Sequence, residues 1–165
     1  MQISKGVEWA AHAAALMCAL PPGKGLRAEA LARYHGVPGP YMAKQMQALS
    51  KAGIVHAARG KHGGYRLARP ADRITLWDVM TAIEGDKPAF TCTEIRQNGP
   101  CGAKPEQCRQ KCAIAAAFHS AEAAFRDHLD AVSLVEIAAG VVAETPAEHL
   151  RDVGKWLEQE AVALA

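Results

Sequence analysis

The stretch that decides the fold is residues 28–67, AEALARYHGVPGPYMAKQMQALSKAGIVHAARGKHGGYRL. It predicts a helix over Ala28–His35, a turn at Gly36 and a second helix whose first turn holds Pro40. The glycine permits the backbone of a tight turn, and the small Ala32 lets the two helices cross closely. This is the pattern of a helix-turn-helix motif.

The second of these helices has one apolar face and one basic face. Met42, Met46 and Leu49 recur at the i, i+4, i+7 spacing of a helix face that packs inward. We therefore expect the opposite face to contact DNA. The residues predicted to do so are Pro40, Tyr41, Lys44, Gln47 and Lys51.

A β-hairpin is predicted directly after the helix pair. Two short segments, starting at Ile54 and at Tyr65, flank the basic, glycine-rich turn of residues 59–64. Helix pair and hairpin together predict a mainly α-helical, winged helix-turn-helix fold, whose wing contacts the DNA backbone. The wing residues predicted to contact DNA are Arg59, Lys61, His62 and Arg66.

The charge distribution agrees with binding of a polyanion. The chain has 165 residues and a net charge of only +2, but its first 73 residues carry 11 basic and 3 acidic side chains. Their net charge of +8 is balanced by −6 in the remainder, which favours DNA binding by the first half. No apolar run approaches the roughly 18 residues of a membrane span, and no signal-peptide cleavage site is recognisable, so we expect a cytoplasmic protein.

Four of the five cysteines, Cys92, Cys101, Cys108 and Cys112, fall within 21 residues. In a cytosolic protein such a cluster is more often metal-binding or redox-active than a structural disulfide framework. The loop that holds them has about 25 residues, which is long for a simple connector in a compact domain. Three chemistries stay open at this point: an iron–sulfur cluster, a zinc site, and a reversible disulfide between Cys108 and Cys112.

The chain from Ala113 onward is predicted to be helical. A short heptad seam predicts that the first helix of this part mediates dimerisation. The seam consists of Ile114, Phe118, Ala121, Phe125, His128 and Val132. We therefore expect a winged-helix DNA-binding domain over residues 1–85, a cysteine-bearing loop over 86–112 and a helical dimerisation region over 113–165.

The chain resembles the IscR/NsrR family of bacterial winged-helix iron–sulfur regulators, also called the Rrf-two family. The resemblance rests on ISKGVEWA at residues 3–10, PYMAKQMQAL at 40–49, GKHGGYRL at 60–67, and the late cysteine cluster. Residues 6–10 and FTCTEIRQ at 90–97 are most similar to the redox-sensing RsrR branch. The resemblance implies a homodimeric repressor that binds a pseudo-palindromic double-stranded DNA operator and carries an iron–sulfur cluster controlling its DNA affinity.

The resemblance also implies a ligand set for the cluster. The gaps between the clustered cysteines, of eight, six and three residues, depart from the commonest family spacing. Cys92 and Cys112 keep the flanking contexts of the outer family cysteines, whereas Cys101 and Cys108 are alternates for the middle position. Ala115 stands where the IscR subgroup has a histidine ligand.

The remaining ligands are implied to come from an N-terminal helix, expected from about Ser4 to Ala19. Glu8 matches an acidic ligand of the NsrR subgroup, and similarity to the RsrR branch adds His12. The i, i+4 spacing suits two donors on one metal centre, although it also fits an ordinary surface pair. The implied set is completed by Cys92 and Cys112 and suits a [2Fe–2S] cluster. Two readings stay open for Trp9, which lies between the candidate ligands of this helix: a core residue, or a reporter of the cluster state.

Two alternatives stay open for the regulator: a nitric-oxide sensor with a [4Fe–4S] cluster, and a thiol/disulfide switch without a cluster. Two other classes are disfavoured. A thiol oxidoreductase would use Cys108 and Cys112, but their spacing is C-x-x-x-C and no βαβ pattern surrounds them. The predicted wing argues against a cluster carrier that does not bind DNA. We therefore expect no enzymatic activity.

Overall fold

The predicted helix-turn-helix is present in the computed structural model of the chain. Helix α2 spans Ala28–His35 and α3 spans Gly39–Lys51. Between them Gly36 adopts a φ of 62°, in the left-handed region that favours glycine. The turn is closed by the Val37 N–H, which donates to the Ala32 carbonyl at 3.0 Å. The glycine signal in the sequence therefore marked the correct turn.

The hairpin wing follows α3 as predicted. Strand β2, Val55–Ala58, pairs antiparallel with β3, Gly64–Leu67. The structure describes residues 2–58, 60 and 63–164, so three of the predicted DNA contacts lie outside the described residues. These are Arg59, Lys61 and His62. The helix pair and the hairpin confirm a mainly helical, winged-helix fold.

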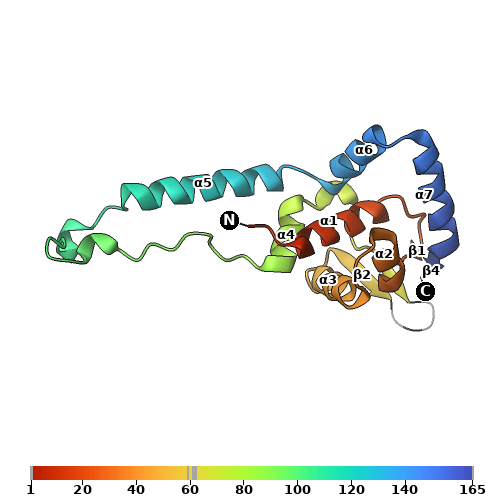
Figure 1. Cartoon of the computed structure of the whole chain (residues 1–165), viewed down its shortest axis with the longest axis horizontal. Coiled ribbons are helices and arrows are strands. Elements are labelled where there is room, and N and C mark those ends of the chain that lie inside the picture. The colour runs from red at the N-terminus through yellow and green to blue at the C-terminus, as the bar shows by residue number, and fades with distance from the viewer. Residues whose placement is uncertain (1, 59, 61–62, 165) are drawn as a thin grey trace.

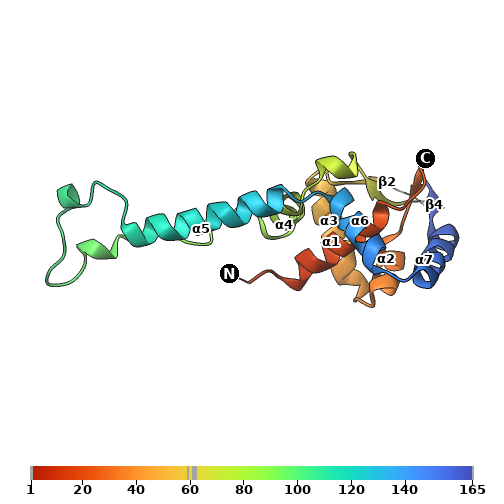
Figure 2. The same ribbon diagram turned by 90° about the horizontal axis from the view of Figure 1, so that it is seen from above.

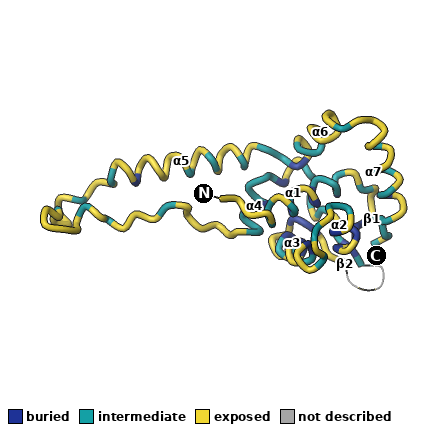
Figure 3. Tube along the Cα trace, in the orientation of Figure 1, coloured by how far each residue is buried: buried dark blue, intermediate teal, exposed yellow. Residues whose placement is uncertain are grey.

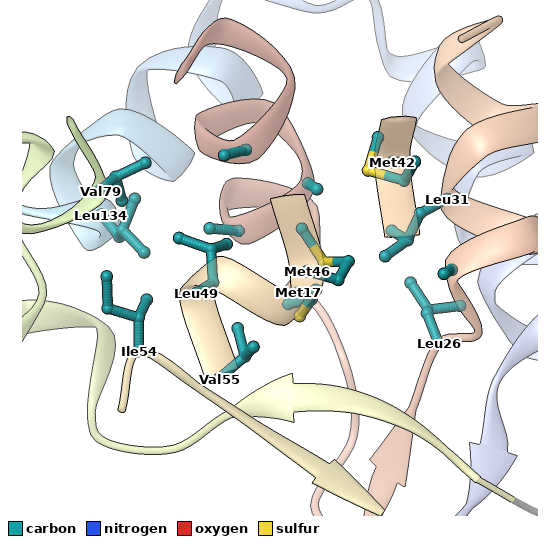
Figure 4. Close-up of a cluster of buried hydrophobic side chains, with 14 of the residues drawn as sticks. Met17, Leu26, Leu31, Met42, Met46, Leu49, Ile54, Val55, Val79 and Leu134 are labelled. Atoms are coloured by element: carbon teal, nitrogen blue, oxygen red, sulfur yellow. The ribbon is translucent and has the colours of Figure 1, made fainter. Parts of the chain in front are cut away.

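Two more helices, α1 and α4, pack against the helix pair in the head of the molecule. Helix α1 spans Lys5–Met17, two residues shorter at its C-terminal end than predicted, and α4 spans Leu76–Glu84. The buried face of α1 consists largely of alanines, including Ala10 and Ala13, which lets α3 and α4 approach it closely. Figure 4 shows the core that results. Its fully buried side chains include Leu31, Met42, Met46, Leu49, Ile54 and Val79.

Two helices begin with capping boxes. At the start of α4, the Asp78 N–H donates to Thr75 Oγ1 at 3.1 Å and the Thr75 N–H donates to Asp78 Oδ2 at 3.0 Å. Ser133 and Glu136 make the same reciprocal pair at the start of α6, Leu134–Glu144. These side chains satisfy N–H groups that have no partner inside the helix.

A long arm leaves the head (Figures 1 and 2). Residues 86–112, which include the short turns η2 (Ile95–Gln97) and η3 (Pro105–Gln107), run outward, and α5, Ala113–Asp130, returns. Figure 3 shows that most of the arm is exposed or only partly buried. Among the described residues, no helix is both long and apolar enough to cross a membrane.

The arm is fastened to itself by side chains between its two branches. Phe90 stacks on Phe118 of α5 with ring centroids 4.7 Å apart. The Ala89 N–H donates to Glu122 at 2.7 Å, and Arg126 pairs with Asp86 at 2.9 Å. The outgoing branch is therefore held along α5.

The C-terminal residues form a helix and then a short strand, and the sequence did not predict the strand. Helix α7, Ala147–Glu160, is followed by β4, Val162–Ala163, which pairs antiparallel with β1, Lys24–Gly25. Thr145 ends α6, and its hydroxyl donates to the Val141 carbonyl at 2.6 Å. The division into three regions stays a prediction.

Candidate functional site

The side chains predicted to read DNA share the outer face of α3. Tyr41, Lys44, Gln47 and Lys51 are all exposed, whereas the intervening Met42, Met46 and Leu49 are buried. Pro40 is exposed in the first turn of the helix. The apolar face therefore fixes the helix on the head and leaves two lysines, an amide and a phenol facing solvent.

An open groove of about 650 Å³ lies between α3 and the wing. Its lining includes Gln47 from α3 and Gly60, Gly64 and Tyr65 from the hairpin. Arg66 is exposed on β3 and faces His56 across the hairpin in register. Among the predicted DNA contacts that the structure describes, Gln47 lines this groove, and Glu29 of α2 adds a carboxylate to it.

Other arginines of the basic half hold the fold together instead. Arg69 donates to Asp78 at 2.9 Å and to the Arg73 carbonyl at 2.7 Å, which ties the end of the wing to α4. Arg33 donates to both carboxylate oxygens of Glu160 at 2.8 Å. The net charge of this half therefore overstates the number of cations available to DNA.

The two predicted ligands of α1 lie on its solvent side. Glu8 and His12 are exposed, whereas Ala10 and Ala13 are buried. Between the two, Trp9 meets Tyr41 of α3 edge to face, with ring centroids 6.2 Å apart. Helix α1 thus carries the predicted ligands on one side and contacts the first turn of the predicted recognition helix.

A histidine that sequence reasoning missed lies beside this pair. The ring centroid of His35, at the end of α2, is 5.9 Å from that of His12. Its Nε2 is buried and lacks a hydrogen-bond partner among the described residues, and burial lowers the pKa of His35, with a further contribution from His12. The contact joins residues 23 positions apart, so no local pattern could have revealed it.

The cysteines of the arm are free thiols with different exposure. Cys92 and Cys101 are exposed, and Cys108 and Cys112 are half-buried. Cys18 in α1 is separate from them. Its thiol donates to the Ala14 carbonyl at 3.6 Å, and burial raises its pKa.

Arg96 organises the cysteine loop, and the sequence did not single it out. Its Nε donates to Glu94 at 2.6 Å and its Nη2 donates to the Gln110 carbonyl at 3.1 Å. Its own carbonyl accepts from the Ala103 N–H at 2.8 Å. Glu94 has a φ of 51°, the only positive φ of a non-glycine residue in the described part of the chain. This single guanidinium therefore joins both ends of the loop.

Cys112 occupies the N-terminal cap of α5. Backbone N–H groups of Ala115 and Ile114 at this helix end lower the pKa of the Cys112 thiol, and Arg96 adds to the effect. A thiolate is the form of cysteine that binds metal. The start of α5 thus favours the ligand form of this side chain.

The two predicted ligand pairs lie at different places in the chain. Figures 1 and 2 show α1 packed in the head and the cysteine loop at the far end of α5. Within the described residues, no three histidine, cysteine or acidic side chains of one chain form a potential metal site. The donor types, namely thiolates, an imidazole and a carboxylate, fit an iron–sulfur cluster if two chains contribute them.

Comparison with known proteins identifies similar chains. Residues 3–140 match the family model described as Rrf2, iron-dependent transcriptional regulator. A protein of Aquifex aeolicus (strain VF5), named as an HTH-type transcriptional regulator, is 39% identical over 109 residues, covering 61% of this chain and 74% of that protein.

Two solved structures share the fold. T. potens IscR matches with a TM-score of 0.65 and 19% identity, over 92% of this chain and 96% of that chain. The global cysteine regulator CymR of B. subtilis matches with a TM-score of 0.65 and 21% identity, over 84% of this chain and 97% of that chain.

Proposed function

The chain belongs to the Rrf2 family of DNA-binding transcriptional regulators, and on that premise we propose that it is a homodimeric repressor whose operator affinity depends on an iron–sulfur cluster. Rrf2 is a family of transcription regulators and not of enzymes. The observation that carries the proposal is the combination of an exposed, basic face on α3 with an ordered loop of free thiols at the end of α5.

Operator reading is assigned to α3 and the wing. In a winged helix the second helix of the motif lies in the major groove, and flanking residues contact phosphates. Lys44 and Gln47 are the exposed side chains near the centre of α3, and Arg66 is the exposed cation of the described part of the wing. We assign base or phosphate contacts to the first two and backbone contacts to the third.

The DNA contact is tested with a duplex that the protein selects from a random-sequence pool. Lys44→Ala should weaken binding and reduce the slope of log Kd against log salt by about one unit, because one phosphate contact is lost. Lys87→Ala removes an exposed lysine outside α3 and the wing and serves as the matched control. Equal affinities and slopes for both variants would place the reading face elsewhere.

The cluster is assigned to a site shared by two chains. Cys92 and Cys112 of one chain, with Glu8 and His12 of the other, would hold a [2Fe–2S] cluster, with Cys108 and Cys101 as alternate thiols. Such a cluster supplies a one-electron redox centre, and a histidine ligand raises its potential. The separation of the two pairs within one chain supports a shared site (Figure 1).

We assign the interface with the second chain to the exposed apolar side chains of α5. Ile114 is 65% exposed and Phe118 is 53% exposed, which is unusual for large apolar residues spaced one helical turn apart. Packing them against a second copy would remove them from water. It would also bring a partner's α1 within reach of the arm.

Helix α1 connects the proposed cluster site to the helix that reads DNA. A displacement of α1 that begins at Glu8 or His12 reaches α3 through the contact between Trp9 and Tyr41. Because each head of a dimer reads one half-site, a small shift of both heads changes the fit to both half-sites together.

A second candidate function is a thiol switch without a cluster. It is favoured by the placement of Arg96, which donates to the Cys108 carbonyl at 3.5 Å and helps to lower the pKa of the Cys112 thiol. Anaerobic purification with iron and sulfide analysis and an absorption spectrum separates the possibilities. Two irons and two sulfides per site support the proposal, four of each indicate a [4Fe–4S] sensor, and neither element indicates the thiol switch.

A further inference from the structure

The C-terminal residues return to the head and pack beside the helix-turn-helix (Figures 1 and 2). Helix α7 lies next to α2 and buries Leu157, which is only 7% exposed. Strand β4 pairs with β1 near the base of the wing. The match to the family model ends at residue 140, so α7 and β4 lie outside the region that this model describes.

One set of contacts holds the end of α2. Arg33 donates to both carboxylate oxygens of Glu160 at 2.8 Å, and the ring of Tyr34 lies 4.6 Å from that of Trp156 between centroids. An exposed ion pair contributes little by itself, but a two-oxygen contact beside an aromatic pair defines one geometry. Both α2 residues lie in the last turn of that helix, shortly before the turn at Gly36 that orients α3.

A second set of contacts holds the base of the wing. Leu26 and Tyr65 exchange two backbone hydrogen bonds, at 2.9 and 2.8 Å. On the other side of the same segment, the Leu164 N–H donates to the Gly23 carbonyl at 2.9 Å. A Cβ at Gly25 would lie 2.6 Å from Leu164 Cδ1 and 2.9 Å from the Tyr65 carbonyl oxygen. Residues 23–26 are thus enclosed between β3 and β4.

These contacts stabilise the wing, which is a hairpin of only two strands. A two-stranded hairpin is at best marginally stable by itself, and additional strands or helices stabilise it. Residues 23–26 and β4 extend the ladder from β3 toward α7. A wing that is ordered before it meets DNA avoids the entropic cost of becoming ordered on binding.

We infer that α7 and β4 form a C-terminal strap that sets the wing and α2 in the arrangement required for operator binding. Trp156 and Glu160 are its positioning residues, and neither lies on the α3 face assigned to DNA. The inference rests on the proposed operator binding.

The sharpest test uses two substitutions with the same change in charge. Glu160→Gln removes the ion pair with Arg33, whereas Glu158→Gln removes an exposed acid of the same helix. Loss of an acid alone should strengthen DNA binding slightly, because DNA is a polyanion. The strap predicts the opposite for Glu160→Gln, an increase of about threefold in Kd, while Glu158→Gln binds at least as tightly as the wild type.

A second pair tests the aromatic contact. Trp156→Ala should raise the operator Kd about tenfold, and Trp156→Phe, which retains a ring against Tyr34, should restore most of the affinity. In protein without DNA, amide exchange at Tyr65 should accelerate in Trp156→Ala and Glu160→Gln, because that amide donates to Leu26.

Wild-type affinity together with unchanged exchange at Tyr65 in Glu160→Gln would overturn the strap, as would tighter DNA binding by that variant. Glu160 is a surface residue, so this variant decides the matter even if Trp156→Ala fails to fold. If the wild-type protein binds no duplex, the proposed operator binding fails. The exchange rate at Tyr65 then still shows whether the strap orders the wing.

Discussion

Cys112 differs from the other cysteines of the arm because it begins α5, where backbone N–H groups lower its thiol pKa. Cys92 and Cys101 are both exposed, and of the two it is Cys92 that keeps the flanking context of an outer family cysteine. We predict that Cys112→Ala and Cys92→Ala each abolish cluster binding, whereas Cys101→Ala retains it. Iron and sulfide content after anaerobic reconstitution measures the outcome. An essential Cys101 would contradict this choice of thiols.

Glu8 and His12 make the second half of the ligand prediction. Glu8→Ala or His12→Ala should change the visible spectrum and the redox potential, or make the cluster labile, because each removes one of four ligands. Lys5→Ala, an exposed change at the start of the same helix, is the control. A cluster with unaltered spectrum and potential in both variants would point to ligation by the cysteines alone.

At the scale of single residues, the sequence predicted which side of a helix is exposed better than it predicted which side chains contact each other. The exposed side of α3 follows from the spacing of Met42, Met46 and Leu49, because burial of one helix face dictates the other. The contacts of His35 with His12, and of Arg96 with the Gln110 carbonyl, join residues separated by 23 and 14 positions. Such contacts depend on how elements pack and leave no local pattern.

Among the elements, α4 and α6 begin with capping boxes, which are local interactions between residues three positions apart. Thr75 tests this, since its hydroxyl caps α4 and donates to Asp130 of α5 at 3.2 Å. Thr75→Ala should lower the free energy of unfolding by about 1 kcal/mol, measured by urea denaturation. Thr75→Ser keeps the hydroxyl and should remain near the wild type; equal losses in both variants would contradict a capping role.

Strands β1 and β4 could not be predicted in the same way. Each has two residues, too few to show an alternating pattern, and they pair across 139 positions. The packing of α7, where Leu157 is buried and Trp156 meets Tyr34 of α2, brings these two strands together. The arm, in contrast, was anticipated in part, since clustered cysteines and a heptad seam have local signatures.

For the molecule as a whole, the exposed seam of α5 predicts association of two chains. Ile114→Asp places a charge on the most exposed large apolar residue of the seam and should produce a monomer in sedimentation velocity. Ile114 is chosen instead of Phe118 because Phe118 also stacks on Phe90 within the chain, so that replacing it would disturb the arm as well as the interface. Ser120→Asp adds the same charge to an exposed position off the seam and should stay dimeric. A dimer in both variants would move the interface away from this face.

Within one chain, α1 and the cysteine loop lie far apart (Figure 1), so our central claim is that their predicted ligands meet between two copies. Operator affinity and cluster state should therefore be coupled. The most direct test is the operator Kd, by fluorescence anisotropy at one fixed salt concentration, for the oxidised, reduced and cluster-free forms of the same preparation. We predict that at least one form differs from the others by about tenfold or more, within the usual range of coupling free energies. The same Kd in all three forms would contradict control of DNA binding by the cluster.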